Sequence, residues 1–292
     1  MIDLMATPLV DPVHETLVAM EPRFEVLPFG KGIEQSLAIG EKLHLTVTTS
    51  PKHGVDHSVE VAEQFRQAGH TVTIHVAARM VRGEDHLTEI LRRARVAGID
   101  DLFVIGGDAE EPSGPFASAG DLLQVLVGHP LRPATIGIGA YPEGHPLIAP
   151  DVLAAALEEK AKVADYIVTQ LCFDMKTVTN WLEGVRAKGI TQPVVLGAVG
   201  PVERMRLLEI ATRIGVGPSL RFLKKQRGIM QLFRSPTHSA TTFYDTAAPV
   251  ASRHDLGIAG FHFFTFNDLV GTRAWELERN EKLREAGKLD ER

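Results

Sequence analysis

Residues 101–108 read DLFVIGGD, and residues 135–146 read TIGIGAYPEGHP. Each stretch begins with a short apolar or glycine-containing run and ends abruptly in polar and turn-forming residues. Such runs are typical of buried parallel strands. Between them, residues 121–128 (DLLQVLVG) have the pattern of a helix. The two stretches therefore predict consecutive strand–helix units, although Gly106-Gly107-Asp108 alone would also suit an ordinary polar loop.

The same alternation continues along the chain in both directions. Further strand-like runs lie at residues 23–29, 43–50, 71–77, 165–174, 192–201 and 261–267. Helix patterns lie at residues 56–69, 84–98, 150–162, 175–189 and 203–214. Eight strands, most of them separated by helices, predict an α/β fold consisting of one parallel (βα)8 barrel over residues 1–292. A doubly wound open sheet is the alternative, but no G-x-G-x-x-G motif follows the first strand.

Three segments lie outside this regular alternation. Residues 1–21 are expected to form an N-terminal arm or helix. Residues 217–256 are expected to form helical segments joined by a loop, and residues 269–292 a charged helical tail. Because no flexible linker or low-complexity stretch interrupts the chain, we expect a single domain.

Composition and charge exclude several classes of function. The chain has 292 residues, 44% of them hydrophobic, with a net charge of −6, which does not suit a nucleic-acid binder. A basic cluster at residues 221–227 (RFLKKQR) fits a solvated helix face or a contact with an anionic ligand tail. No membrane span or secretory signal is apparent. The single Cys172 fits a reducing compartment, so we expect a cytoplasmic protein.

Polar side chains recur where the expected strands end. In a parallel barrel these ends surround one mouth, where ligands bind. Glu25, flanked by Phe24 and Val26, either projects into that mouth as a proton donor or faces water at an edge. The His53–His57 pair lacks the intervening glutamate of a zinc protease helix, so we expect no metal. The strand-end residues are Glu25, Thr48, His75, Asp108, Tyr141 with His145, Gln170 and Asn267.

The order of these motifs resembles the flavin-binding catalytic barrel of the methylenetetrahydrofolate reductase family. AYPEGHP (140–146) and DYIVTQLCFD (165–174) are the most specific of the matching stretches. The others are FEVLPF (24–29), TVTTS (46–50), TIHVA (73–77), IGGD (105–108) and GFHFFTFN (260–267). The resemblance implies reduction of 5,10-methylenetetrahydrofolate to 5-methyltetrahydrofolate, with hydride passing from NAD(P)H through FAD. The implied partners are a folate substrate and a nicotinamide nucleotide.

The resemblance also implies roles for individual residues. Glu25 matches the acid that protonates the folate nitrogen, and Asp108 matches the carboxylate beside flavin and pterin. Gln170 matches a folate contact, and Met205 stands where the family has an aromatic residue near the substrate. The remaining matches are flavin-site positions: Thr48, His75, Gly106, Gly107, Asp108, Tyr141, His145 and Lys160.

This chain departs from the family pattern at several positions. Gly106 replaces the arginine of the usual R-G-D, which weakens FAD binding unless another cation, Lys52, Arg79 or Arg82, substitutes for it. The first strand reads FEVLPF, and residues 217–256 match poorly. Two alternatives therefore stay open. One is a folate- or pterin-binding barrel without redox activity, or a subunit that needs a partner protein. The other is an NAD(P)H reductase without flavin. Pairing of exposed barrel helices would make a homo-oligomer.

Overall fold

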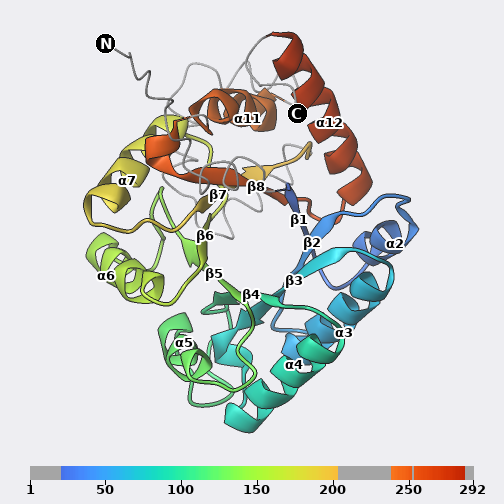
Figure 1. Ribbon diagram of the computed structural model, residues 1–292, viewed down its shortest axis with the longest axis vertical. Coiled ribbons are helices and arrows are strands. Elements are labelled where there is room, and N and C mark those ends of the chain that lie inside the picture. Colours follow the sequence, from blue (N-terminus) through green and yellow to red (C-terminus); the bar gives the residue numbers. More distant parts are fainter. Residues whose placement is uncertain (1–20, 203–237, 252, 287–292) are drawn as a thin grey trace, which may run out of the picture.

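A closed barrel of eight parallel strands forms the centre of the molecule, in the order β1-β2-β3-β4-β5-β6-β7-β8. The computed structural model describes residues 21–202, 238–251 and 253–286. Figure 1 looks into the ring of strands, with the helices outside it. Each strand pairs in parallel with its neighbours in sequence, and β1 pairs with β8 to close the ring. The predicted (βα)8 barrel is confirmed.

The element boundaries follow the predicted alternation. The strands are β1 (Arg23–Val26), β2 (His44–Val47), β3 (Thr71–Ala77), β4 (Asp101–Ile105), β5 (Thr135–Ala140), β6 (Tyr166–Thr169), β7 (Val194–Val199) and β8 (Ile258–Phe264). The described helices are α2 (Lys31–Ala38), α3 (Gly54–Gln67), α4 (Glu84–Val96), α5 (Ala119–Val127), α6 (Pro150–Ala161), α7 (Met175–Ala187), α11 (His238–Ala251) and α12 (Leu269–Glu285). Short 3-10 turns lie at Ala78–Met80 and His254–Leu256.

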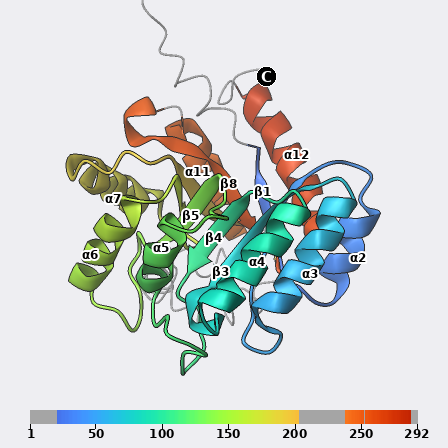
Figure 2. The ribbon, with the colours of Figure 1, turned by 60° about the horizontal axis from the view of Figure 1, so that its bottom comes forward.

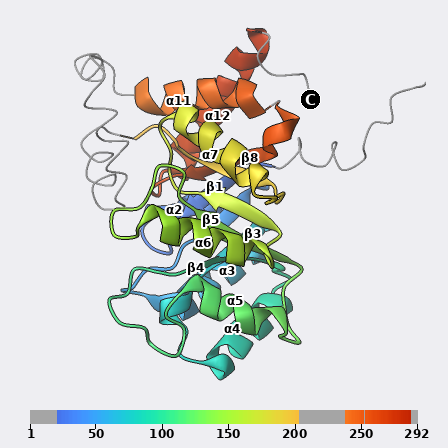
Figure 3. The same ribbon diagram turned by 90° about the vertical axis from the view of Figure 1, so that its left-hand side faces the viewer.

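Most of the hydrophobic core lies between the strands and the surrounding helices. Phe24, Leu45 and Ile74 alternate along their strands with polar residues and are completely buried in this layer. Strand side chains point alternately to the two faces of the sheet, so the intervening polar residues point into the barrel. Helices α2, α3 and α4 stand side by side against one flank (Figure 2). The view from the side in Figure 3 shows α5, α6 and α7 along the other flank.

A few elements differ from the expectation. Strand β6 ends at Thr169, five residues earlier than expected, although Gln170 N–H still donates to Ala140 O (2.7 Å) and Cys172 N–H to Gly197 O (3.1 Å). Helix α2 was not predicted; its eight residues are too few for a clear periodic pattern, and Gly30 before it adopts φ 69°. Helix α12 covers residues 269–285 of the expected tail, and α11 lies in the expected helical segment.

Some predictions fall on residues that the structure does not describe. They are the N-terminal arm up to residue 20, the helix over residues 203–214, Met205 and the basic cluster at residues 221–227. Within the described ranges, no helix combines the length and apolar character needed to cross a membrane.

Candidate active site

A buried polar network fills the amino-terminal end of the barrel. The Asp101 carboxylate accepts hydrogen bonds from Arg23 (3.2 Å), Thr73 (2.7 Å) and Tyr166 (2.9 Å). His44 lies 2.7 Å from the Thr73 hydroxyl. Burial raises the pKa of Asp101 and, together with the charge of Arg23, lowers the pKa of His44 to about 3. Branched aliphatic residues usually fill this region of a barrel. The network occupies the floor of the barrel, so the opposite end is the candidate ligand-binding mouth.

Above the floor, three ionisable side chains from β1, β3 and β8 meet inside the barrel. Glu25 Oε2 lies 3.2 Å from His262 Nε2, and their side chains are 13% and 2% exposed. His75 packs against the Phe103 ring at 4.7 Å, and its Nε2 has no hydrogen-bond partner among the described residues. Burial lowers the pKa of His75 well below its usual value, so its imidazole is neutral. Buried polar atoms normally find a partner, so a bound ligand would suit this position.

The same three residues are a candidate ligand set for a metal ion. One donor atom from each of Glu25, His75 and His262 lies within 4.8 Å of the other two. Two imidazoles and a carboxylate suit divalent transition metals. A metal would displace the hydrogen bond between Glu25 and His262. His53 and His57, by contrast, are hydrogen-bonded to Ser50, Glu60 and Pro28.

The loops after β4 and β5 bring the second predicted carboxylate to the rim. Asp108 is exposed, and its charge acts on both Tyr141 and His145. Burial first, and Asp108 second, raise the pKa of Tyr141; burial lowers that of His145. The Tyr141 and His145 rings meet edge to face at 5.1 Å. The structure therefore brings Asp108, Tyr141 and His145 together at the rim, with Glu25 and His75 inside the barrel.

The remaining predicted positions have different surroundings. Thr48 is buried at the end of β2, and its hydroxyl has no partner among the described residues. Gln170 accepts a hydrogen bond from the backbone N–H of Leu171 (2.8 Å). Lys160 donates to the Gly139 carbonyl (2.8 Å), and burial lowers its pKa to about 8. Gly106 and Gly107 form the turn after β4, and Gly107 has φ 90°.

Two side chains fasten neighbouring rim loops together. Asn267 accepts from Leu27 N–H (2.9 Å) and donates to Phe29 O, so it holds the β1 loop instead of facing the mouth. Glu143 accepts from the backbone N–H groups of Phe173 (2.7 Å) and Asp174 (2.9 Å). Sequence reasoning missed the roles of Glu143 and His262, although both lie inside quoted motifs, because neither contact is local in sequence.

The residues present fit a planar polar ligand at the rim. The unpartnered Thr48 hydroxyl and His75 Nε2 could hydrogen-bond the ring of a flavin, the cofactor that the family resemblance implies. Of the three cations considered as substitutes for the family arginine, two are occupied. Arg79 donates to three backbone carbonyls, and Arg82 pairs with Asp56 (2.8 Å). Lys52 is exposed and has no ion pair within the described ranges, so it is the one left for a phosphate.

A closed parallel barrel with ionisable side chains gathered at one mouth is the arrangement of (βα)8-barrel enzymes. Within that class the sequence points to one family. Residues 31–273 match the sequence profile of methylenetetrahydrofolate reductases, and the chain belongs to that family.

Individual relatives agree with this assignment over part of their length. The chain is 34% identical over 119 residues to methylenetetrahydrofolate reductase 1 of Schizosaccharomyces pombe; the match covers 37% of this chain and 19% of that protein. It is 27% identical over 144 residues to a probable methylenetetrahydrofolate reductase (NADPH) of Caenorhabditis elegans, covering 47% of this chain and 21% of that protein. The matched segments thus span about a fifth of these relatives.

A solved structure has a similar fold over nearly the whole chain. It is an uncharacterized protein from Clostridium thermocellum that binds two copies of 5-methyl-5,6,7,8-tetrahydrofolic acid. The TM-score is 0.61 at 12% identity, and the match covers 91% of this chain and 96% of that one. At this identity the likeness concerns the fold.

Proposed function

We propose that this protein interconverts 5,10-methylenetetrahydrofolate and 5-methyltetrahydrofolate, with NAD(P)H as the source of hydride. The observation that carries the proposal is the family match over residues 31–273, which includes the positions of Asp108 and the rim residues. The folate-binding relative of the same fold supports the substrate class. The relatives are longer than the matched segments, so activity, substrate and nucleotide are all part of the proposal.

In this proposal Glu25 supplies the proton. Hydride can reach the bridging carbon only after the methylene bridge opens to an iminium, and opening requires a proton on the leaving nitrogen. Glu25 lies inside the barrel, and His262 would orient its carboxyl group, since His262 Nε2 is 3.2 Å from Glu25 Oε2. Asp108, at the exposed rim, would hydrogen-bond the pterin and stabilise the positive charge of the iminium. Gln170 and Met205 would contact the folate.

FAD is the carrier that the family resemblance implies. When bound, it would supply a two-electron relay between NAD(P)H and the folate. Thr48, His75, Tyr141 and His145 would surround its ring and ribityl chain, and Lys52 or Lys160 would meet its phosphates. A second candidate, direct transfer from NAD(P)H to the folate, is favoured by one observation. Gly106 replaces the family arginine, and the guanidinium groups of Arg79 and Arg82 are already engaged.

The visible spectrum of the purified protein, followed by a turnover assay, separates these candidates. A yellow protein whose flavin absorbance is bleached by NADH or NADPH supports the flavin route. A colourless protein that FAD does not reconstitute, but that oxidises NAD(P)H when methylenetetrahydrofolate is added, supports direct transfer. Absence of NAD(P)H oxidation under both conditions rules out the proposed reaction and leaves the folate-binding barrel without redox activity.

Two further predictions belong to this proposal. A cytoplasmic location agrees with the single buried Cys172. A homo-oligomer, predicted from the exposed barrel helices, is checked by sedimentation of the purified protein.

A further inference from the structure

The loop between β4 and α5 carries Asp108 but has little regular structure. Residues 106–118 contain neither helix nor strand before Ala119 starts α5. Within the described ranges the Asp108 carboxylate has no hydrogen bond or ion pair, so the backbone of this loop determines where it lies. A reacting or stabilising group must be held closely, since misplacement by about 1 Å can reduce the rate on the order of 10²-fold. Another part of the chain must therefore hold the loop.

One side chain from the 3-10 turn after β3 does so. The Arg79 guanidinium donates from Nε to Ala109 O (2.7 Å), from one terminal nitrogen to Ala117 O (3.1 Å), and from the other to Glu110 O. Backbone contacts add to these bonds. Arg79 N–H donates to Gly106 O (3.0 Å), and Ser113 N–H donates to Arg79 O (2.8 Å). A single residue thus contacts the loop just before Asp108, just after it and at its far end.

The backbone packs closely on both sides of this contact. A Cβ atom on Gly107 would lie 2.8 Å from Ala77 Cβ, and one on Gly114 would lie 2.6 Å from the carbonyl groups of Val81 and Arg82. The loop therefore lies directly against residues 77–82, the segment that contains Arg79. Among the described residues, the Arg79 side chain donates only to backbone carbonyls, so it holds the course of the loop independently of the loop's own side chains.

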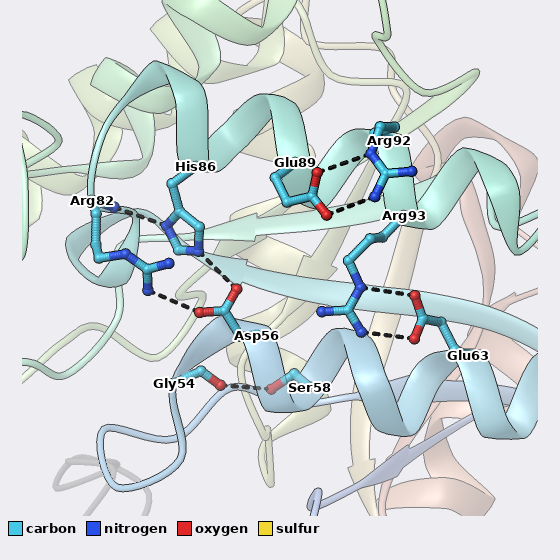
Figure 4. A network of polar contacts seen from close by, with 9 residues as sticks. All are labelled: Gly54, Asp56, Ser58, Glu63, Arg82, His86, Glu89, Arg92 and Arg93. Carbon is cyan, nitrogen blue, oxygen red and sulfur yellow. Dashed lines mark hydrogen bonds and ion pairs between the residues drawn. The ribbon is translucent and has the colours of Figure 1, made fainter.

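We propose that Arg79 is the positioning residue for Asp108, and this inference rests on the proposed function. The family pattern has an arginine two residues before this aspartate, where the chain has Gly106. Here a guanidinium from the 3-10 turn after β3 contacts the same turn from outside, through the backbone. Arg82, three residues further on, serves a different purpose. Its side chain is 61% exposed and pairs with Asp56, which also accepts from His86 (Figure 4).

The test compares Arg79→Ala with Arg82→Ala, a matched control that loses the same charge from the same turn. We expect Arg79→Ala to lower kcat for folate reduction on the order of 10²-fold, with little change in the KM for NAD(P)H. Guanidinium ion at low millimolar concentration should restore part of the activity of Arg79→Ala. Arg82→Ala should keep wild-type kcat. A folded Arg79→Ala protein with wild-type kcat overturns the proposal.

A double-mutant cycle with Asp108→Asn identifies the residue through which Arg79 acts. If Arg79 acts by placing Asp108, Arg79→Ala in an Asp108→Asn background should lower kcat by less than about threefold, because the effects of coupled residues are non-additive. Full additivity of the two effects overturns the proposal.

Hydrogen exchange measures how firmly Arg79 holds the loop at residues 106–118, independently of turnover. Arg79→Ala should speed exchange of the backbone amides in residues 106–118, and Arg82→Ala should not. Unchanged exchange in Arg79→Ala overturns the inference that Arg79 holds this loop, even if activity falls. A wild-type protein without folate turnover overturns the proposed function instead, and the clamp is then judged by exchange alone.

Discussion

Glu25 and His262 are separated by 236 intervening residues in the sequence, yet Oε2 of one lies 3.2 Å from Nε2 of the other. They come from β1 and β8, the two strands whose pairing closes the barrel, with Arg23 opposite His262 in the register. His262 Nδ1 is buried and has no partner among the described residues. Nε2 is therefore the His262 nitrogen that has a hydrogen-bond partner among the described residues, and this partner is the Glu25 carboxyl group. The strand pairing that closes the barrel therefore also brings His262 to the predicted acid.

Glu25→Gln should abolish folate reduction while the protein stays folded. The amide keeps the size of the side chain and a hydrogen bond to His262 but cannot donate a catalytic proton, and general acid catalysis is worth roughly 10²–10⁴-fold. If flavin is bound, its reduction by NAD(P)H should be nearly unaffected. Stopped-flow measurement of the two half-reactions, with a melting curve, checks this. Near wild-type folate reduction by the folded variant would rule out the assignment of Glu25 as the acid.

A chelator separates this role from metal binding by the same residues. Glu25, His75 and His262 offer a plausible donor set, and a metal on Glu25 would remove its proton-donating role. We expect turnover to be unchanged after extensive dialysis against EDTA, with elemental analysis of the protein as the control. Loss of activity on chelation, restored by a divalent metal, would show that the three residues serve a metal centre.

Lys160 should titrate near pH 8. Burial lowers its pKa to about 8, whereas an unfolded lysine titrates at about 10.4. The ammonium is charged below pH 8 and neutral above it, so an anion held by Lys160 should bind more weakly as pH rises through 8. Between about pH 8 and 10.4 the unfolded chain binds more protons, so this group increases the free energy of unfolding as pH rises. NMR titration of the lysine side chains, with Lys160→Met to assign the signal, measures the midpoint; a midpoint near 10.4 would contradict the expectation.

His44 should make the barrel acid-sensitive. Its folded pKa is about 3, and in the unfolded chain it is about 6.5, so the unfolded state alone takes up a proton between these values. The free energy of unfolding should therefore fall below pH 6.5, by up to about 1.4 kcal/mol per pH unit from this residue. Urea unfolding of wild type and His44→Gln at pH 7, 6 and 5 tests this. The free energy of unfolding should fall less steeply with decreasing pH in the variant. Equal slopes would show that His44 does not cause the acid sensitivity.

Gly137→Ala should destabilise the floor of the barrel. A Cβ atom there would lie 2.2 Å from the ring of Tyr166, which is buried and hydrogen-bonded to Asp101 and so has no room to move. Overpacking of this kind costs about 1–3 kcal/mol. Gly139→Ala on the same strand is the control, because its nearest contact is the Phe103 ring at 3.7 Å. Chemical unfolding should separate the two variants; equal stability would mean that Tyr166 can be displaced.

The sequence by itself determined the fold class and the chemical character of the mouth. Strand-like runs such as residues 71–77 and 101–105 alternate with helix patterns, and that alternation depends only on local side-chain periodicity. Strand ends in a parallel barrel also lie on one rim by construction, so Thr48 and Asp108 could be assigned to it, whereas Glu25 lies deeper, inside the barrel. The family resemblance followed from short motifs, each of which can be recognised in the sequence without the structure.

Only the tertiary structure decided which polar residues meet and which are already engaged. Asn267 follows β8 and was a candidate ligand contact, but its amide fastens the β1 loop. Arg79 and Arg82 are equivalent as free cations in the sequence, yet one clamps the Asp108 loop and the other pairs with Asp56. His262 reaches Glu25 only because the barrel closes. Periodicity fixes the face on which a side chain lies, whereas its partner depends on strand register and loop path, which come from contacts distant in sequence.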